Sequence, residues 1–188
     1  YLDELSITAF CLSLHGMGGG SFHSRYLGSL GGYQQGSPEY EQLFSRYLGA
    51  VEAHLREKGW LDKAYTYWFD EPEPRDYDFV KDGMSLLGRA APGVRRLLTE
   101  EVTPELIGSV DIWCPLTPNY DKQSCETRQA AGDEIWWYVC TGPKAPYCGL
   151  FIDHSAIEMR MWLWQTWQAN VQGVLVWTTN YWTSDCAY

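Results

Sequence analysis

Short apolar segments alternate with longer amphipathic segments along almost the whole chain, and this alternation most constrains the fold. We expect strands at residues 5–14, 64–69, 95–99, 110–114, 134–140 and 173–179. We expect helices at residues 38–58, 76–90, 120–131 and 155–170. Strands that alternate with helices are typical of a parallel sheet covered by helices. The sequence therefore predicts an α/β fold with about six β-α units.

The helix expected at residues 38–58 has clear boundary signals. Ser37 is a suitable N-cap, Pro38 fits the first turn, and Glu39 adds a favourable negative charge there. Gly59 is suited to end the helix. Apolar residues recur between them at helical spacing, namely Leu43, Tyr47, Val51 and Leu55. The Gly-rich residues 15–36 that precede this helix are expected to form a loop.

A doubly wound sheet and a (β/α)8 TIM-type barrel both fit this alternation. No G-x-G-x-x-G motif follows the first expected strand, and the Gly-rich loop does not match a phosphate cradle. Barrel enzymes build their sites just past the carboxyl ends of the strands. Polar and aromatic residues gather at those ends: His15, Asp70, Glu71, Glu100, Glu101, Trp113, Tyr138 and residues 178–182. We therefore predict that residues 1–188 form a single, incomplete barrel domain that lacks the first two strands.

Composition narrows the range of partners. The chain has 10 Trp and 13 Tyr, an excess that fills a core or lines a site where flat ligands stack. A net charge of −10 argues against nucleic acid or an anionic membrane surface as a partner. No apolar stretch is long enough to span a membrane. No Cys or His spacing fits a zinc site, and we predict neither a metal nor a cofactor.

The six cysteines allow two interpretations. An even number suits disulfides in an exported protein, and Cys140 and Cys148 could close a loop between them. Six buried free thiols are the alternative. We expect disulfides and an extracellular or otherwise exported location.

The stretch "YWFDEPEPRDYDF", residues 67–79, places Asp70 and Glu71 side by side where a strand ends. Such a pair can simply be a solvated acidic turn. Here it follows three aromatic residues, which favours a functional site. Pro72 restricts the residue before it to extended conformations, so we expect Glu71 to project from the end of the strand.

Two carboxylates in an aromatic surround suggest glycoside hydrolysis. The later strand at 134–140 ends in Cys140, Thr141 and Gly142, so it offers no acid that could act as a nucleophile. In substrate-assisted hydrolysis a 2-acetamido oxygen of the sugar attacks the anomeric carbon instead. One carboxylate then holds the acetamido N–H, and its neighbour protonates the leaving oxygen. An ordinary mechanism that pairs Glu71 with Glu100 or Glu101 stays open.

The ordered pieces "YWFDEPEP", "DIWCPL", "EIWWYVC" and "RMWLWQTWQANVQGVLVWTTNYW" resemble glycoside hydrolase family 123, the β-N-acetylgalactosaminidases and related domains. The resemblance implies a (β/α)8 catalytic domain, which usually follows an N-terminal β-sandwich. It implies a retaining exo-β-N-acetylhexosaminidase that acts through an oxazoline on a glycan or glycoconjugate. It also implies that Asp70 stabilises the acetamido group and that Glu71 is the general acid/base.

Aromatic residues near the strand ends are candidates for binding the sugar. The favoured set is Tyr138, Trp177, Asn180 and Tyr181, with Trp113 and His15 as further candidates. Core packing is the competing role, because Trp136 and Trp137 must point to opposite faces of a strand. A different class of function also remains open, a catalytically inactive glycan-binding or structural fragment. Further domains or another chain would complete the barrel in such an extracellular assembly.

Overall fold

The computed structural model describes residues 2–21 and 24–178, and the chain divides into two compact units, residues 1–112 and 113–188. Each unit combines parallel strands with helices, which confirms the predicted α/β fold. The incomplete barrel and the single domain stay predictions.

Three short parallel strands form the centre of the first unit. They are β1 (Phe10–Leu12), β6 (Ala64–Tyr67) and β8 (Arg95–Leu98), with β6 in the middle. Tyr67, at the end of β6, lies opposite Leu97 of β8. This register places the residues that follow the two strands at one edge of the sheet. The strand expected at residues 5–14 has only three residues, and the apolar side chains before it are exposed.

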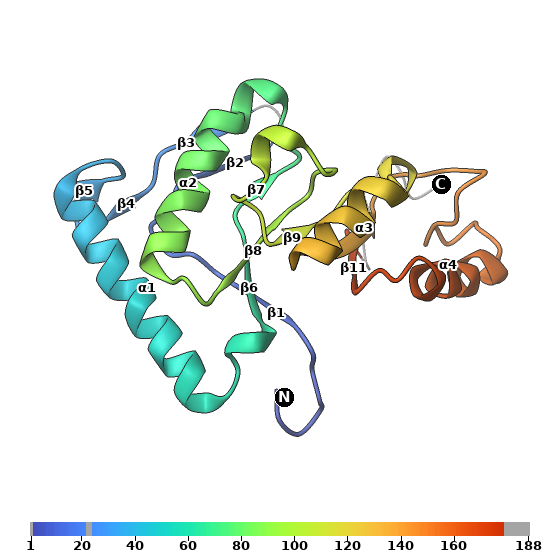
Figure 1. Cartoon of the computed structure of the whole chain (residues 1–188), viewed down its shortest axis with the longest axis horizontal. Coiled ribbons are helices and arrows are strands. Elements are labelled where there is room, and N and C mark those ends of the chain that lie inside the picture. Colours follow the sequence, from blue (N-terminus) through green and yellow to red (C-terminus); the bar gives the residue numbers. More distant parts are fainter. Residues whose placement is uncertain (1, 22–23, 179–188) are drawn as a thin grey trace. The chain divides into compact units, whose positions relative to one another are not determined.

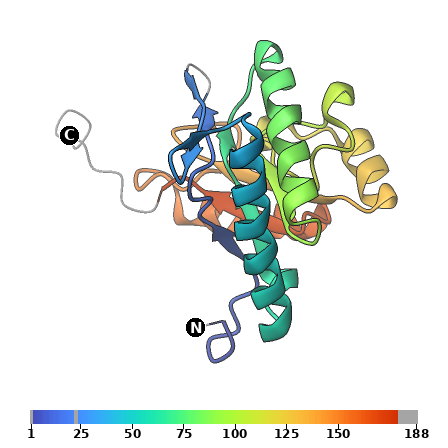
Figure 2. The same ribbon diagram turned by 90° about the vertical axis from the view of Figure 1, so that its left-hand side faces the viewer.

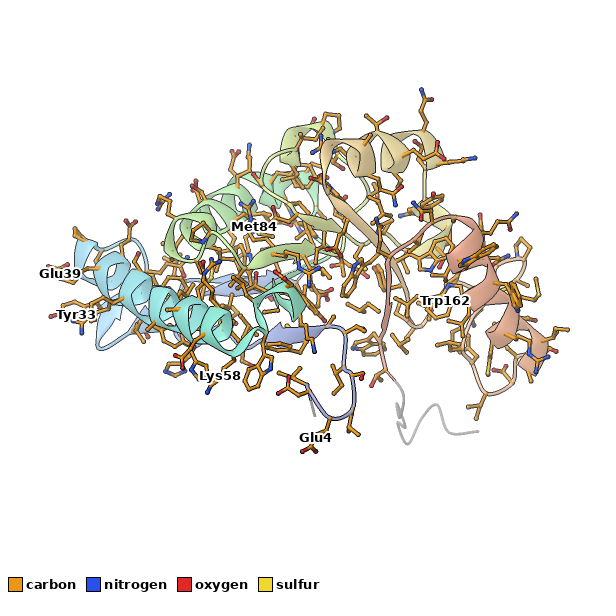
Figure 3. All side chains as sticks on the ribbon, turned by 60° about the horizontal axis from the view of Figure 1, so that its bottom comes forward. Glu4, Tyr33, Glu39, Lys58, Met84 and Trp162 are labelled. Atoms are coloured by element: carbon orange, nitrogen blue, oxygen red, sulfur yellow. The ribbon has the colours of Figure 1, made fainter. Side chains whose placement is uncertain are left out.

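Helices α1 (Pro38–Lys58) and α2 (Tyr77–Ala90) lie side by side in the first unit (Figure 1, Figure 2). Both boundaries of α1 are confirmed. Ser37 Oγ accepts a hydrogen bond of 3.2 Å from the Tyr40 N–H, and Gly59 takes a φ of 70° beyond the last turn. Figure 3 shows Glu39 and Lys58 at opposite ends of α1, where their charges complement the helix dipole.

The buried face of α1 differs from the one that the apolar spacing suggested. Tyr40, Phe44 and Leu48 are buried, whereas the side chains of Leu43 and Tyr47 are only half-buried. The aromatic rings of Tyr40 and Phe44 stack with their centroids 5.4 Å apart. In α2 the side chains of Val80, Met84 and Leu87 are buried in the core, and Figure 3 labels Met84 among the surrounding side chains.

The Gly-rich residues 15–36 contain strands where a loop was expected. Strands β4 (Ser29–Leu30) and β5 (Tyr33–Gln34) pair antiparallel around Gly31 and Gly32, whose φ angles are 60° and 87°. Two consecutive positive φ angles favour glycine and give a turn that suits a hairpin. Strand β2 pairs with β3 and with β7 in a separate small sheet. These strands are β2 (Gly19–Ser21), β3 (Ser24–Tyr26) and β7 (Phe69–Asp70).

The second unit contains β10 (Glu134–Val139) and β11 (Gly173–Val176), which pair in parallel, and helices α3 (Lys122–Ala131) and α4 (Ala156–Gln168). Strand β9 (Ile112–Trp113) spans the boundary between the units. Gly173 lies opposite Trp136, and a Cβ on it would lie 2.3 Å from the indole ring. Short 3-10 turns occur at Leu61–Lys63, Pro74–Asp76, Pro104–Leu106 and Thr117–Asn119.

The prediction of a Cys140–Cys148 disulfide is wrong. Cys11, Cys114, Cys125, Cys140 and Cys148 are all free thiols, and Cys186 lies outside the described residues. A disulfide needs Cβ atoms about 3.5–4.5 Å apart, a condition that sequence spacing does not supply. Burial raises the pKa of Cys114 and Cys125, which therefore behave as small apolar core groups. In the described ranges, no helix has both the length and the apolar character needed to cross a membrane.

Candidate active site

The predicted acid pair lies where two neighbouring strands of the first unit end. Asp70 is the last residue of β7, opposite Ser21 of β2, and both Asp70 and Glu71 are half-buried. Glu71 has a φ of 44°, so the expected extended conformation is wrong. Pro72 disfavours the right-handed helical region, but Glu71 turns the other way and donates its backbone N–H to Thr99 Oγ1 at 2.8 Å. Because of this turn, Glu71 no longer follows the strand geometry in which successive side chains point to opposite faces of the sheet.

The carboxylate of Asp70 is held by two hydroxyl groups. Tyr67 donates its hydroxyl hydrogen to Oδ1 of Asp70, and Thr99 Oγ1 lies 3.3 Å from the same oxygen. Thr99 follows β8 and is 3% exposed. Within the described ranges, both side-chain hydrogen bonds of Asp70 end on Oδ1. One oxygen of this carboxylate is therefore anchored, and the other is available to a ligand.

A third carboxylate follows directly after Thr99. Glu100 is half-buried and accepts a hydrogen bond of 3.2 Å from the Tyr77 hydroxyl. Burial, with smaller contributions from the charges of Glu101 and Glu71, raises the pKa of Glu100 to about 7. Burial also raises the pKa of Tyr77, and the charge of Glu100 adds to that shift. A carboxyl group that is half protonated near neutral pH can act as an acid or a base.

The segment after the acid pair is fixed by a buried aspartate. Asp76 is 1% exposed, and its Oδ2 accepts a hydrogen bond of 2.8 Å from the Glu73 N–H. Arg25 of β3 forms an ion pair with the other oxygen of Asp76. Because an unpaired buried carboxylate is costly, this pair ties the small sheet to the turn that follows Glu71.

The remaining predicted site residues have mixed surroundings. His15 is exposed in the turn after β1. Trp113 is fully buried in the second unit, where its indole N–H donates to Asp133 at 2.7 Å. Tyr138 on β10 is 4% exposed, and Trp177, just after β11, is 47% exposed. Asn180 and Tyr181 lie outside the described residues.

The structure thus brings Asp70, Glu71 and Glu100 together in the first unit. Sequence reasoning missed three residues that hold them: Tyr67, Tyr77 and Thr99. The sequence offered one signal, a hydroxyl side chain close to an expected acid. Tyr67 lies three residues before Asp70, and Thr99 lies one residue before Glu100. Across residues 2–21 and 24–178, no three His, Cys, Asp or Glu side chains are grouped so that they could hold a metal ion.

A family model and a solved structure both match this chain and point to the same family. The model of the catalytic domain of glycoside hydrolase 123 matches residues 23–187. A family 123 glycoside hydrolase from Clostridium perfringens, solved to study glycolipid glycan hydrolysis, is 21% identical with a TM-score of 0.57. The match covers 79% of this chain and 27% of that one, so this chain spans about a quarter of its length and shares its fold.

A glycosyl hydrolase family 2 member from Bacteroides cellulosilyticus DSM 14838 superposes less well. It is 10% identical with a TM-score of 0.41, and the match covers 85% of this chain and 19% of that one. None of the curated proteins matches the chain.

Proposed function

Because the chain belongs to the glycoside hydrolase 123 catalytic domain family, we propose that it is the catalytic part of a retaining exo-β-N-acetylhexosaminidase. The proposed substrate is a glycan or glycoconjugate that ends in β-N-acetylgalactosamine, and the proposed mechanism is substrate-assisted. The observation that carries this proposal is the different anchoring of two adjacent carboxylates. The hydroxyl groups of Tyr67 and Thr99 hold Oδ1 of Asp70. Glu71 instead has a positive φ, which turns the backbone out of the strand direction.

In the first step, Asp70 orients the substrate. Its Oδ2 accepts a hydrogen bond from the acetamido N–H, which makes the acetamido carbonyl oxygen more nucleophilic. Tyr67 and Thr99 keep Oδ1 occupied, so the carboxylate cannot rotate freely. The acetamido oxygen forms a bond to the anomeric carbon as the bond to the leaving oxygen breaks. Glu71 donates its carboxyl proton to that leaving oxygen.

In the second step, Glu71 acts as a base. Its carboxylate takes a proton from water, the water oxygen bonds to the anomeric carbon, and the oxazolinium ring opens to restore the acetamido group. Each step inverts the anomeric carbon, so the product keeps the β configuration. The proposal requires no nucleophilic acid elsewhere, in agreement with Cys140, Thr141 and Gly142 after β10.

One observation favours a second candidate. Glu100 has a pKa of about 7 and its charge couples to that of Glu71, as in a glycosidase with two catalytic carboxylates. Such an enzyme would hydrolyse sugars that lack an acetamido group. The anchored Oδ1 of Asp70 has no role in that mechanism, so we favour the first candidate.

The remaining parts of the proposal concern the surroundings of the site. Trp177, Asn180 and Tyr181 stay predicted contacts of the sugar. We propose that further domains or another chain complete the barrel. An extracellular location stays a prediction that the described cysteines, all free thiols, do not support.

The test compares aryl β-N-acetylgalactosaminide, β-N-acetylglucosaminide and β-galactoside as substrates of the purified protein. The proposal predicts hydrolysis of the acetamido sugars, inhibition by a thiazoline that mimics the oxazolinium, and a β-configured product by NMR. Equal rates on the plain galactoside would support the two-carboxylate mechanism instead. Glycan binding without any turnover would support the inactive binding fragment.

A further inference from the structure

We propose that Thr99 is a positioning residue whose single hydroxyl sets the geometry of both Asp70 and Glu71. The inference rests on the proposed function, because it assigns Thr99 a role in that reaction. Thr99 reaches both acids from the end of β8, the strand that pairs with β6. It lies 29 residues from Asp70 and 28 residues from Glu71 along the chain.

The position of Thr99 is rigid. It directly follows β8, whose last two residues, Leu97 and Leu98, are fully buried. Thr99 itself is 3% exposed, and its β-branched side chain has few accessible rotamers. The hydroxyl oxygen therefore has a fixed place at the edge of the sheet.

The hydrogen bonds of this hydroxyl can be assigned atom by atom. The Glu71 N–H is a donor, so Thr99 Oγ1 accepts in the 2.8 Å contact. The one hydroxyl hydrogen of Thr99 points to Asp70 Oδ1, 3.3 Å away, and Thr99 Oγ1 also lies 3.3 Å from the Tyr67 hydroxyl oxygen. Tyr67 donates its own hydrogen to Asp70 Oδ1. The three side chains thus form one connected network on Asp70 Oδ1 that leaves Asp70 Oδ2 for the substrate.

The same hydroxyl stabilises the unusual backbone of Glu71. A φ of 44° is unfavourable for a residue with a side chain, and such conformations persist only when the surroundings hold them. The bond to Thr99 is a contact that does so. Without it Glu71 would relax towards an extended conformation, and its carboxyl group would move away from the leaving oxygen. A shift of about 1 Å at a catalytic group can lower the rate about 100-fold.

Thr99→Val and Thr99→Ser separate the hydroxyl from the shape of the side chain. We expect Thr99→Val to lower kcat about 100-fold with little change in KM. Thr99→Ser keeps the hydroxyl and should stay within about threefold of the parent. An aryl substrate with a much better leaving group needs less acid catalysis, so it should partly rescue Thr99→Val. A general packing defect would not depend on the leaving group. Thr99→Ala replaces Thr99→Val in this comparison if the valine variant does not fold.

Crystal structures of the two variants provide a readout that needs no turnover. We expect Glu71 to keep a positive φ in Thr99→Ser and to lose it in Thr99→Val. An unchanged Glu71 backbone in Thr99→Val, or an equal loss of kcat in both variants, would overturn the inference. If the parent protein hydrolyses no acetamido sugar, the proposed function fails. The φ of Glu71 in the two variants still decides whether Thr99 sets the geometry of the acid pair.

Discussion

The Tyr77 hydroxyl donates a hydrogen bond of 3.2 Å to Oε1 of Glu100, on the residue after Thr99. This bond favours the ionised carboxylate, but burial and the charges of Glu101 and Glu71 outweigh it. The pKa of Glu100 is therefore about 7 in the folded protein, above the 4.5 of an unperturbed Glu. The site holds a carboxyl group that changes charge close to neutral pH.

Glu100→Gln should stabilise the protein in a pH-dependent way. The folded state favours the neutral form of Glu100, so this contribution to stability is full below about pH 4.5 and is lost as the pH rises through about 7. Glutamine stays neutral and avoids the loss. After allowance for partial exposure of Glu100, we expect a gain of about 1 kcal/mol at pH 8 and almost none at pH 4. Urea unfolding at both pH values measures this difference.

Glu105→Gln, at an exposed position, controls for the removal of a negative charge. A gain for Glu100→Gln that is the same at pH 4 and pH 8, or that Glu105→Gln reproduces, would contradict the assignment.

Gly83→Ala should destabilise the first unit. A Cβ on Gly83 would lie 2.3 Å from two atoms of the Trp68 indole, which packs on α2 next to the acid pair. Alanine favours a helix by about 1 kcal/mol over glycine, but the overlap should cost more, for a net loss of about 1–3 kcal/mol. Gly49→Ala in α1 is the matched control, because its nearest contact would be 3.7 Å away. Equal free energies of unfolding for the two variants would show that Trp68 moves aside freely.

Asp111→Asn should destabilise the packing around β8, the strand that contains Arg96. Asp111 accepts three hydrogen bonds from Arg96. They come from the backbone N–H at 2.8 Å and from Nε and Nη2 of the guanidinium group at 2.7 Å and 2.8 Å. Loss of this bidentate ion pair should lower the free energy of unfolding by about 1–3 kcal/mol. Asp78→Asn removes the exposed partner of Lys81 and should change stability little. Urea unfolding of both variants at neutral pH checks the prediction, which fails if their losses are equal.

The two carboxylates of the proposed mechanism, Asp70 and Glu71, should respond differently to the leaving group. Glu71→Gln removes the proposed general acid and should lower kcat about 100- to 10,000-fold on substrates with poor leaving groups, but much less on activated aryl substrates. Asp70→Asn impairs the attack of the acetamido group, so its loss should be similar for both substrate types. Steady-state kinetics on a series of aryl N-acetylgalactosaminides measures this, with Glu105→Gln as the control. Identical dependence on the leaving group in the two variants would show that their roles are not distinct.

Much of the fold could be predicted from local patterns. The boundaries of α1 follow from Ser37 and Gly59, each of which acts within one turn of the helix. The strands β2 to β5 were missed because glycine weakens strand patterns, although the Gly31-Gly32 pair is a recognised hairpin signal. The buried face of α1 was misjudged because several apolar residues compete for it, and tertiary packing buries Phe44 and Leu48.

In the candidate site, too, local patterns were predictable from the sequence and tertiary contacts were not. Asp70 and Glu71 stood out because adjacent acids before a proline at a strand end form a local pattern. Thr99 could not be linked to them, because its contacts depend on the register that places Tyr67 opposite Leu97. The raised pKa of Glu100 depends on burial and on charges from separate segments. Such properties arise from tertiary structure, and no local pattern in this sequence encodes them.

The most direct test of the account measures kcat/KM for aryl β-N-acetylgalactosaminides whose acetyl group carries zero to three fluorine atoms. Fluorine withdraws electrons from the acetamido oxygen and makes it a poorer nucleophile. We predict a steady fall of at least about tenfold in kcat/KM between the acetyl and trifluoroacetyl substrates, corresponding to about 1.4 kcal/mol in the barrier. A rate that does not depend on the number of fluorine atoms would show that the acetamido group does not attack. It would contradict the substrate-assisted mechanism.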